Sequence, residues 1–166
     1  MYARGSRQQA IYRTHDDRQT YLRLLARAVA RHRWNCLAYC LMGNHLHLLI
    51  ETPEANLGKG MQSLHGGYAR LVNQRYGAKG ALFESRYGCV RMENDAQLWM
   101  TIRYIARNPV EAGLSPRAEN YEWSSYGAVV RRKAPPFLSL ARLLSCLSIG
   151  GGDALENYRG LVTADF

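Results

Sequence analysis

The sequence predicts an α+β fold in which one antiparallel sheet carries helices packed on one face. Two observations indicate this class. Apolar residues recur every three or four positions in three long segments, and they cluster or alternate in short runs between those segments. The first pattern is typical of helices and the second of strands. At 166 residues, the chain has the size of one ordinary domain.

Local signals set the order of the elements. Helix starts are predicted at Thr14 or Asp16, and again at Asn94 or Asp95, because short polar side chains cap the first turn of a helix. Pro109 is expected to end the later helix, since the residue before a proline disfavours helical geometry. The expected elements are a strand at 1–4, a helix after 14–16, strands at 34–41 and 45–51, a helix at 55–76, a strand or hairpin at 81–92 and a helix up to Asn108.

The pair Gly43-Asn44 predicts a tight turn between two of these strands, and therefore a hairpin. With this hairpin, the element order is typical of a ferredoxin-like sandwich. After an irregular, aromatic-rich stretch at 120–126, the segment Leu138–Leu147 is amphipathic. We expect residues 1–130 to form the main domain and residues 131–166 to form a helical extension of it.

The charge of the chain points to a polyanionic partner. Lys and Arg number 22 against 13 Asp and Glu, which gives a formal charge of +9. Such a surplus favours nucleic acid, because phosphates release counterions on binding, although a basic protein with no special partner remains an alternative. The four cysteines show no disulfide spacing, and no apolar run is long enough to cross a bilayer. We therefore expect a cytoplasmic protein without a membrane partner.

His45 and His47 lie two residues apart in a predicted strand, and their side chains therefore leave the same face. Their Cβ atoms would be roughly 6.5–7 Å apart, which lets both rings reach one metal ion. The residues that alternate with them are apolar. Two other interpretations stay open: a solvated strand face, or a structural zinc site completed by Cys40, opposite His47 across the turn, and Cys36.

Tyr104 and Asn108 are adjacent on the polar face of the last predicted helix, because residues four apart lie one turn from each other. Arg103 and Arg107 flank them and could contact phosphates. The chain has eleven tyrosines, and a half-exposed tyrosine on a helix needs no catalytic explanation. The residues alone therefore make Tyr104 one candidate among several.

Five motifs occur in order within roughly residues 4–126. They are YCLMGNHLHLLI (39–50), MQSLHGGYARLVNQRY (61–76), GALFESRY (80–87), RYIARNPVEAGL (103–114) and NYEWSSY (120–126). Together they resemble the single-tyrosine HUH transposases, and most closely the REP-associated tyrosine transposases. The resemblance implies the ferredoxin-like, RRM-like HUH fold.

The resemblance also implies roles for particular residues. His45 and His47 would be the metal ligands with Asn108 as the third, and Tyr104 would be the nucleophile that forms a 5′-phosphotyrosine. The implied cofactor is Mg²⁺ or Mn²⁺, the implied partner is single-stranded or hairpin DNA, and a homodimer is left open. The arginines expected to contact DNA are Arg4, Arg7, Arg86, Arg91, Arg103 and Arg107.

Similar proteins usually have a longer segment before Arg4-Gly5, so we expect fewer contacts from this edge to a hairpin. Two other functions are compatible with the residues. One is a domesticated or decayed transposase that binds nucleic acid without cutting it, through basic charge and exposed aromatic rings. The other is a zinc-dependent hydrolase that cleaves without a covalent intermediate.

Overall fold

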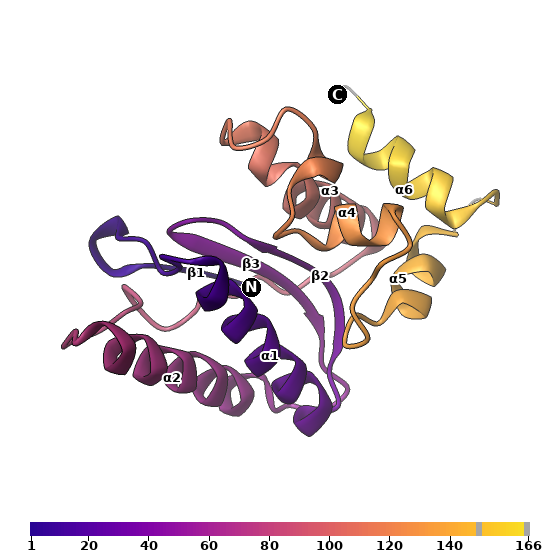
Figure 1. Cartoon of the computed structure of the whole chain (residues 1–166). Coiled ribbons are helices and arrows are strands. Elements are labelled where there is room, and N and C mark those ends of the chain that lie inside the picture. Colours follow the sequence, from indigo (N-terminus) through magenta and orange to yellow (C-terminus); the bar gives the residue numbers. More distant parts are fainter. Residues whose placement is uncertain (149–150, 165–166) are drawn as a thin grey trace.

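A computed structural model of the chain describes residues 1–148 and 151–164. Within these residues, a three-stranded antiparallel sheet lies at the centre, in the order β1-β3-β2 (Figure 1). Its strands are β1 (Tyr2–Arg4), β2 (Asn35–Leu41) and β3 (His45–Glu51). The α+β class with an antiparallel sheet, predicted from the sequence, is confirmed.

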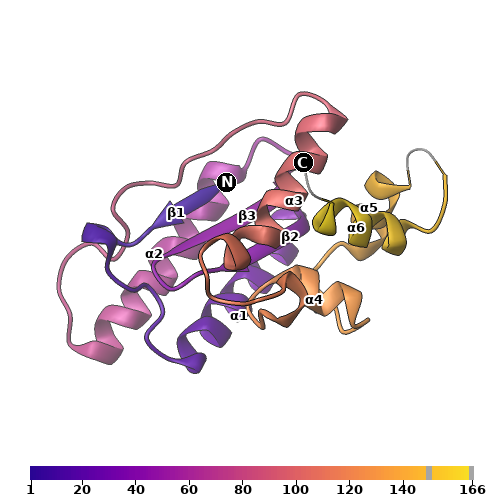
Figure 2. The same cartoon turned by 90° about the horizontal axis from the view of Figure 1, so that it is seen from above.

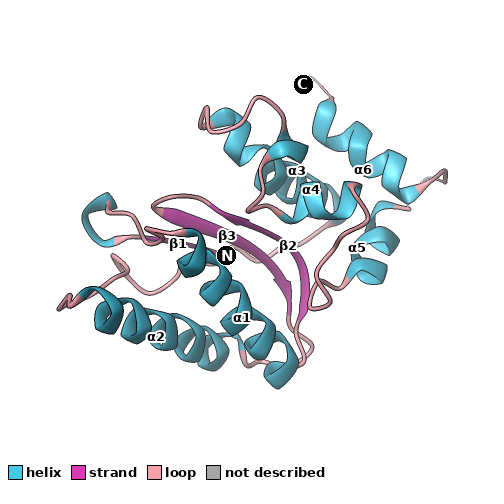
Figure 3. Cartoon of the chain, viewed as in Figure 1, coloured by secondary structure: helices cyan, strands magenta, loops and turns pink. Residues whose placement is uncertain are grey.

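Helices cover both faces of the sheet, whereas the sequence predicted them on one (Figure 3). On one side lie α1 (His15–His32) and α2 (Leu57–Tyr76); on the other lie α3 (Asp95–Glu111) and α4 (Ser125–Val130). Strand β2 gives the physical reason. Six of its seven residues are buried, so the side chains on both of its faces need a covering layer.

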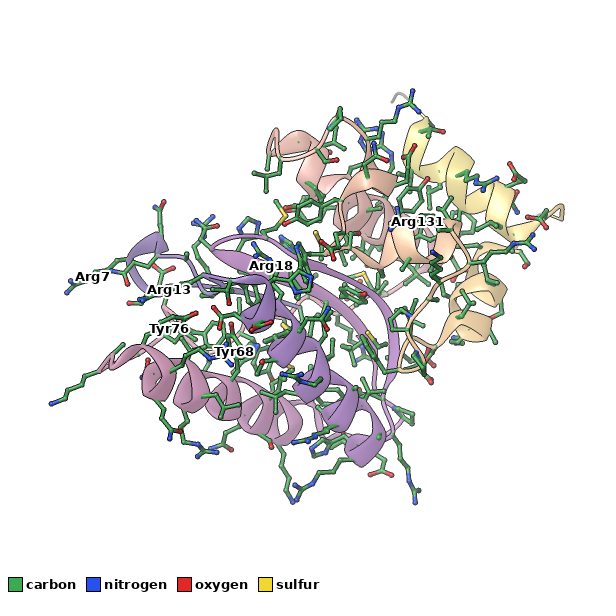
Figure 4. All side chains as sticks on the ribbon, in the orientation of Figure 1. Arg7, Arg13, Arg18, Tyr68, Tyr76 and Arg131 are labelled. Atoms are coloured by element: carbon green, nitrogen blue, oxygen red, sulfur yellow. The ribbon has the colours of Figure 1, made fainter. Side chains whose placement is uncertain are left out.

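The layer of α1 and α2 begins and ends at the predicted signals. Thr14 caps α1: its hydroxyl accepts from the Asp17 N–H, and the Asp17 carboxylate accepts from the N–H of Thr14. Helix α2 ends at Gly77, whose φ of 60° suits glycine. Figure 4 shows Arg13 beside Tyr76 at one end of this layer, where the guanidinium lies 4.4 Å from the centre of the ring.

The hairpin between β2 and β3 has the predicted two-residue turn. The Met42 N–H donates to the His45 carbonyl oxygen over 2.9 Å, which leaves Gly43 and Asn44 as the loop. Cys40 lies directly opposite His47 in the antiparallel register. The turn therefore fixes which residues of β2 share a face with the histidines.

The segment predicted as a strand or hairpin at 81–92 is extended but forms no regular strand. It runs along the outer edge of β1 (Figure 2), with isolated bridges from Gly5 to Phe83 and from Tyr2 to Gly88. Five residue steps separate the bridges on this segment and only three on β1. The edge segment therefore has two extra residues between the bridges, around Ser85 and Arg86. These residues cannot pair with β1, and they interrupt the ladder of hydrogen bonds.

Helix α3 does not stop at Pro109 but ends at Glu111. Proline removes one backbone donor and crowds the carbonyl oxygen four residues earlier, and α3 accommodates this change within its last turn. The chain then closes the helix with hydrogen bonds from Ala112 to the Asn108 carbonyl oxygen and from Leu114 to that of Pro109. The extra turn keeps Asn108 inside the helix.

Two further helices lie in the predicted helical extension at 131–166. They are α5 (Leu140–Leu147), within the amphipathic stretch, and α6 (Ala154–Thr163), whose bounds the sequence did not predict. Leu143 of α5 and Tyr158 of α6 are fully buried and belong to the same apolar cluster as the sheet. Across the described ranges, no helix combines the length and the apolar character that a membrane span requires.

Candidate active site

The structure brings four predicted site residues together on the face of the sheet that α3 covers. The rings of His45 and His47 on β3 have their centres 5.1 Å apart, and the centre of the Tyr104 ring lies 5.2 Å from that of His47. Asn108, one turn further along α3, places its side-chain oxygen 3.2 Å from Nε2 of His45. One chain therefore contains both imidazoles, the phenol and the amide.

The elements that carry these residues are held firmly. β3 is the central strand and is paired on both sides, which fixes the direction of both histidines. Helix α3 buries Ile102 and Ile105 in the core, and Tyr104, which is 48% exposed, lies at the edge of this packing beside His47. An exposed phenol beside half-buried imidazoles can meet a substrate without a large movement of the chain.

His45 is oriented by a residue that the sequence interpretation missed. Its Nδ1 lies 2.8 Å from the side-chain oxygen of Asn44 in the turn, while its Nε2 faces the side-chain oxygen of Asn108. A neutral imidazole has only one N–H, and an amide oxygen can only accept. The His45 ring can therefore donate to one of the two amides, and its other nitrogen keeps a lone pair that can accept from an amide N–H or bind a cation.

The electrostatics of both histidines suit metal ligation. Burial, with smaller contributions from neighbouring His45 and the N-terminal amine, lowers the pKa of His47 to about 4. Burial also lowers the pKa of His45, against the opposing effect of its hydrogen bond with Asn108. Both rings are therefore neutral at pH 7, which is the form that binds a metal ion. In the described part of the chain, the buried Nε2 of His47 has no hydrogen-bond partner, so its lone pair is available.

These observations fit a divalent cation held by His45, His47 and the Asn108 side chain. The zinc alternative does not fit. The register of β2 shifts between Cys36 and Ala38, so Cys36 pairs with Ile50 and turns to the face away from the histidines. Among residues 1–148 and 151–164, no group of three or more His, Cys, Asp or Glu side chains could hold an ion.

A cleft of about 580 Å³ opens over the histidines and Tyr104. Its wall includes Thr101, which lies on the same face of α3 as Tyr104, and this shared face was visible in the helical spacing. Glu84, Ser85 and Arg86 reach the cleft from the interrupted edge segment. Arg86 was expected to contact DNA, whereas nothing in the sequence singled out Glu84 or Ser85, because their position follows from how that segment pairs with β1.

The six predicted arginines divide into groups. Arg4 and Arg86 line the cleft, and Arg7 is exposed and extends away from the sheet (Figure 4). Arg91 is exposed and lines a neighbouring cavity instead.

Arg103 and Arg107 point elsewhere. Arg103 donates to the carbonyl oxygen of Ala164 over 2.6 Å, and Arg107 donates to that of Val162 over 3.1 Å. Both carbonyls lie at the C-terminal end of α6, where the partial charge is negative and attracts cations. The structure therefore joins these two side chains to α6 rather than to the cleft.

The arrangement is that of a known class. The fold is similar to a solved structure described as a REP-associated tyrosine transposase bound to a REP hairpin, with a TM-score of 0.66 and 14% sequence identity. The match covers 82% of this chain and 80% of that one. The two chains therefore share the α+β architecture around the cleft.

The family follows from the sequence itself. The family model described as "Transposase IS200 like" matches residues 3–108, a range that contains all four site residues. The chain belongs to this IS200-like transposase family, and the family resemblance seen in its motifs is confirmed. No curated protein matches the chain in sequence.

Proposed function

We propose that this protein cuts and rejoins single-stranded DNA at hairpin-associated sites, with Tyr104 as nucleophile and a divalent cation, Mg²⁺ or Mn²⁺, held by His45, His47 and Asn108. The observation that carries the proposal is the contact between the Tyr104 ring and the His47 ring, whose centres are 5.2 Å apart within one chain. The hairpin bound by the structurally similar transposase supports hairpin DNA as the partner.

The chemistry is in-line transfer of a phosphoryl group. The Tyr104 oxygen attacks the phosphorus, the bond between phosphorus and the 3′-oxygen breaks, and the DNA keeps its 5′-phosphate on tyrosine. The phenolic proton passes to solvent and the departing 3′-oxygen takes one up, so a 3′-OH is released. When bound, the cation draws charge from a non-bridging phosphate oxygen. Another 3′-OH reverses the step without ATP, because the ester bond is retained.

The protein's other side chains position the strand. Arg4 and Arg86 lie in the cleft wall and would neutralise phosphates on either side of the cut. Arg7 and Arg91 are exposed further out and could follow the DNA away from the site. Because both histidines and Tyr104 come from one chain, the chemistry does not require a second copy, although a homodimer stays a prediction.

A covalent adduct tests the proposal. The protein is incubated with single-stranded DNA that carries candidate hairpins, with Mn²⁺ present, and then separated on a denaturing gel. We expect an adduct for the wild type and none for Tyr104→Phe. Tyr2→Phe is the matched control, since Tyr2 lines the same cleft and is 52% exposed; it should behave as wild type. Hairpin binding without any adduct would favour the non-catalytic alternative.

A further inference from the structure

A second cavity adjoins the active cleft across a shared wall. It measures about 600 Å³ and lies between α2 and residues 81–87 of the edge segment; we call it the α2 cavity. Ser85 and Arg86 line both the α2 cavity and the cleft over the histidines. A DNA strand with a phosphate at Tyr104 would therefore have its neighbouring nucleotides beside this opening.

The lining of the α2 cavity suits a flat heterocycle. The rings of His65 and Phe83 are stacked there, with centres 4.3 Å apart and planes 21° from parallel. The rest of the lining combines apolar side chains such as Met61 and Leu82 with polar ones, among them Gln62 and Arg86. Ligand sites of roughly 300–1,000 Å³ combine apolar walls with a few polar groups in this way, and bases stack on aromatic side chains.

Gly66 of α2 leaves the α2 cavity open to a ligand. At Gly60 a Cβ would meet the Trp34 ring at 2.2 Å, so packing within the protein explains that glycine. At Gly66, which lines the α2 cavity, a Cβ would meet nothing within 4 Å. Gly66 therefore leaves space that a larger side chain at this position of the lining would occupy.

We infer that the α2 cavity receives one unpaired base of the DNA strand that is cut at Tyr104, while Arg86 in the shared wall contacts the phosphate between the two sites. This assignment rests on the proposed function. A base attached to a phosphate fits better than a free apolar molecule, because the wall carries a cation and the chain has a surplus of nine positive charges.

Two adjacent glycines provide a matched pair of variants. Gly66→Leu fills the cavity, whereas Gly67→Leu changes a residue that does not line it and whose Cβ would also meet nothing within 4 Å. Both changes raise helix propensity equally. If Gly66→Leu fails to fold, Gln62→Trp fills the cavity from an exposed position, with Ser63→Trp as its control.

The measurement is the Kd for a fluorescein-labelled DNA hairpin with unpaired flanks, compared with the same hairpin whose flanks are abasic. Wild type and Gly67→Leu should bind the intact flanks roughly tenfold or more tightly than the abasic ones, as expected for a stacked base. Gly66→Leu should lose most of that ratio. Equal ratios for Gly66→Leu and Gly67→Leu would overturn the assignment.

Adduct formation on the same DNA separates the two proposals. If the wild type forms no adduct while its binding still depends on the flanking bases and on Gly66, the α2 cavity stands and the role of Tyr104 falls. If the wild type forms an adduct and Gly66→Leu binds with an unchanged ratio, the catalytic proposal stands and the cavity assignment is wrong.

Discussion

The two faces of β3 carry alternating residues of one short strand and yet do different work. Leu46 and Leu48 are fully buried in the apolar core on the side of α1 and α2. His45 and His47 lie half-buried on the other side, beneath α3 and beside the cleft. Side chains of a strand alternate between its two faces, so burying one face in the core sets the register of the strand. The register in turn determines which side chains lie on the opposite, reactive face. Variants on the two faces should therefore affect different measurements.

The largest effect is expected on the histidine face. His47→Ala removes one proposed ligand, so the rate of adduct formation should fall by at least about a hundredfold, as when a group that stabilises transition-state charge is lost. The melting temperature should hardly change, because the histidine face opens to the cleft. Rates are measured with Mn²⁺ and with EDTA. A variant as active as wild type would remove His47 from the mechanism.

The opposite face should give the reverse result. Leu48→Ala leaves a hole in the core and should lower the free energy of unfolding by about 2–5 kcal/mol, measured by urea denaturation. The folded fraction should still form the adduct at nearly the wild-type rate at low temperature. A stable variant that has lost the reaction would show that the two faces are not separable.

The alternation of β3 could be predicted from the sequence because the period of a strand is local. The same holds for the Thr14 cap and for the turn at Gly43-Asn44, where the signal and the structure lie within a few residues. The approach of Tyr104 to His47 was implied only by family resemblance. No local rule states that a helix far along the chain will lie across this strand.

The errors of prediction have the same origin. Two features depend on how many residues each of two paired segments contributes between its hydrogen bonds. They are the bulge that turns Cys36 away from the histidines and the interrupted pairing near Arg86. The guanidinium of Arg107 donates to the Val162 carbonyl oxygen of α6, a contact between distant segments that no local pattern could predict, and its contact with DNA stays a prediction. The division of the chain at residue 130 stays a prediction.

A buried carboxylate between α1 and α2, that of Asp17, should make the free energy of unfolding depend on pH. Asp17 is 1% exposed; burial alone would raise its pKa, but hydrogen bonds from Tyr76, the Arg13 and Thr14 backbone and Arg75 outweigh burial and hold the pKa below 3.8. A depressed pKa stabilises the fold above the unfolded value, and this contribution is lost as the pH falls through the folded value.

Asp17→Asn should therefore cost about 1–3 kcal/mol at pH 7, and the difference from wild type should shrink as the pH falls below about 4. Urea denaturation at a series of pH values measures it. A difference that stays constant down to pH 2 would mean that the carboxylate charge contributes nothing. Burial lowers the pKa of His47 to about 4, so this residue also costs stability as the pH falls from about 6.5 towards 4. That cost is common to wild type and Asp17→Asn, and it cancels in the difference between them.

The smallest effects are expected when an arginine in the cleft, Arg86, or an arginine that contacts α6, Arg107, is replaced. Arg86→Ala should weaken hairpin binding and lower the slope of log K against log salt by about 0.9, the value for one lost phosphate contact. Arg107→Ala should leave that slope unchanged, because its guanidinium donates to the Val162 carbonyl oxygen. It should instead lower the free energy of unfolding by about 1 kcal/mol. A reduced slope for Arg107→Ala would return this residue to the DNA contacts predicted from the sequence, and would mean that α6 moves aside when DNA binds.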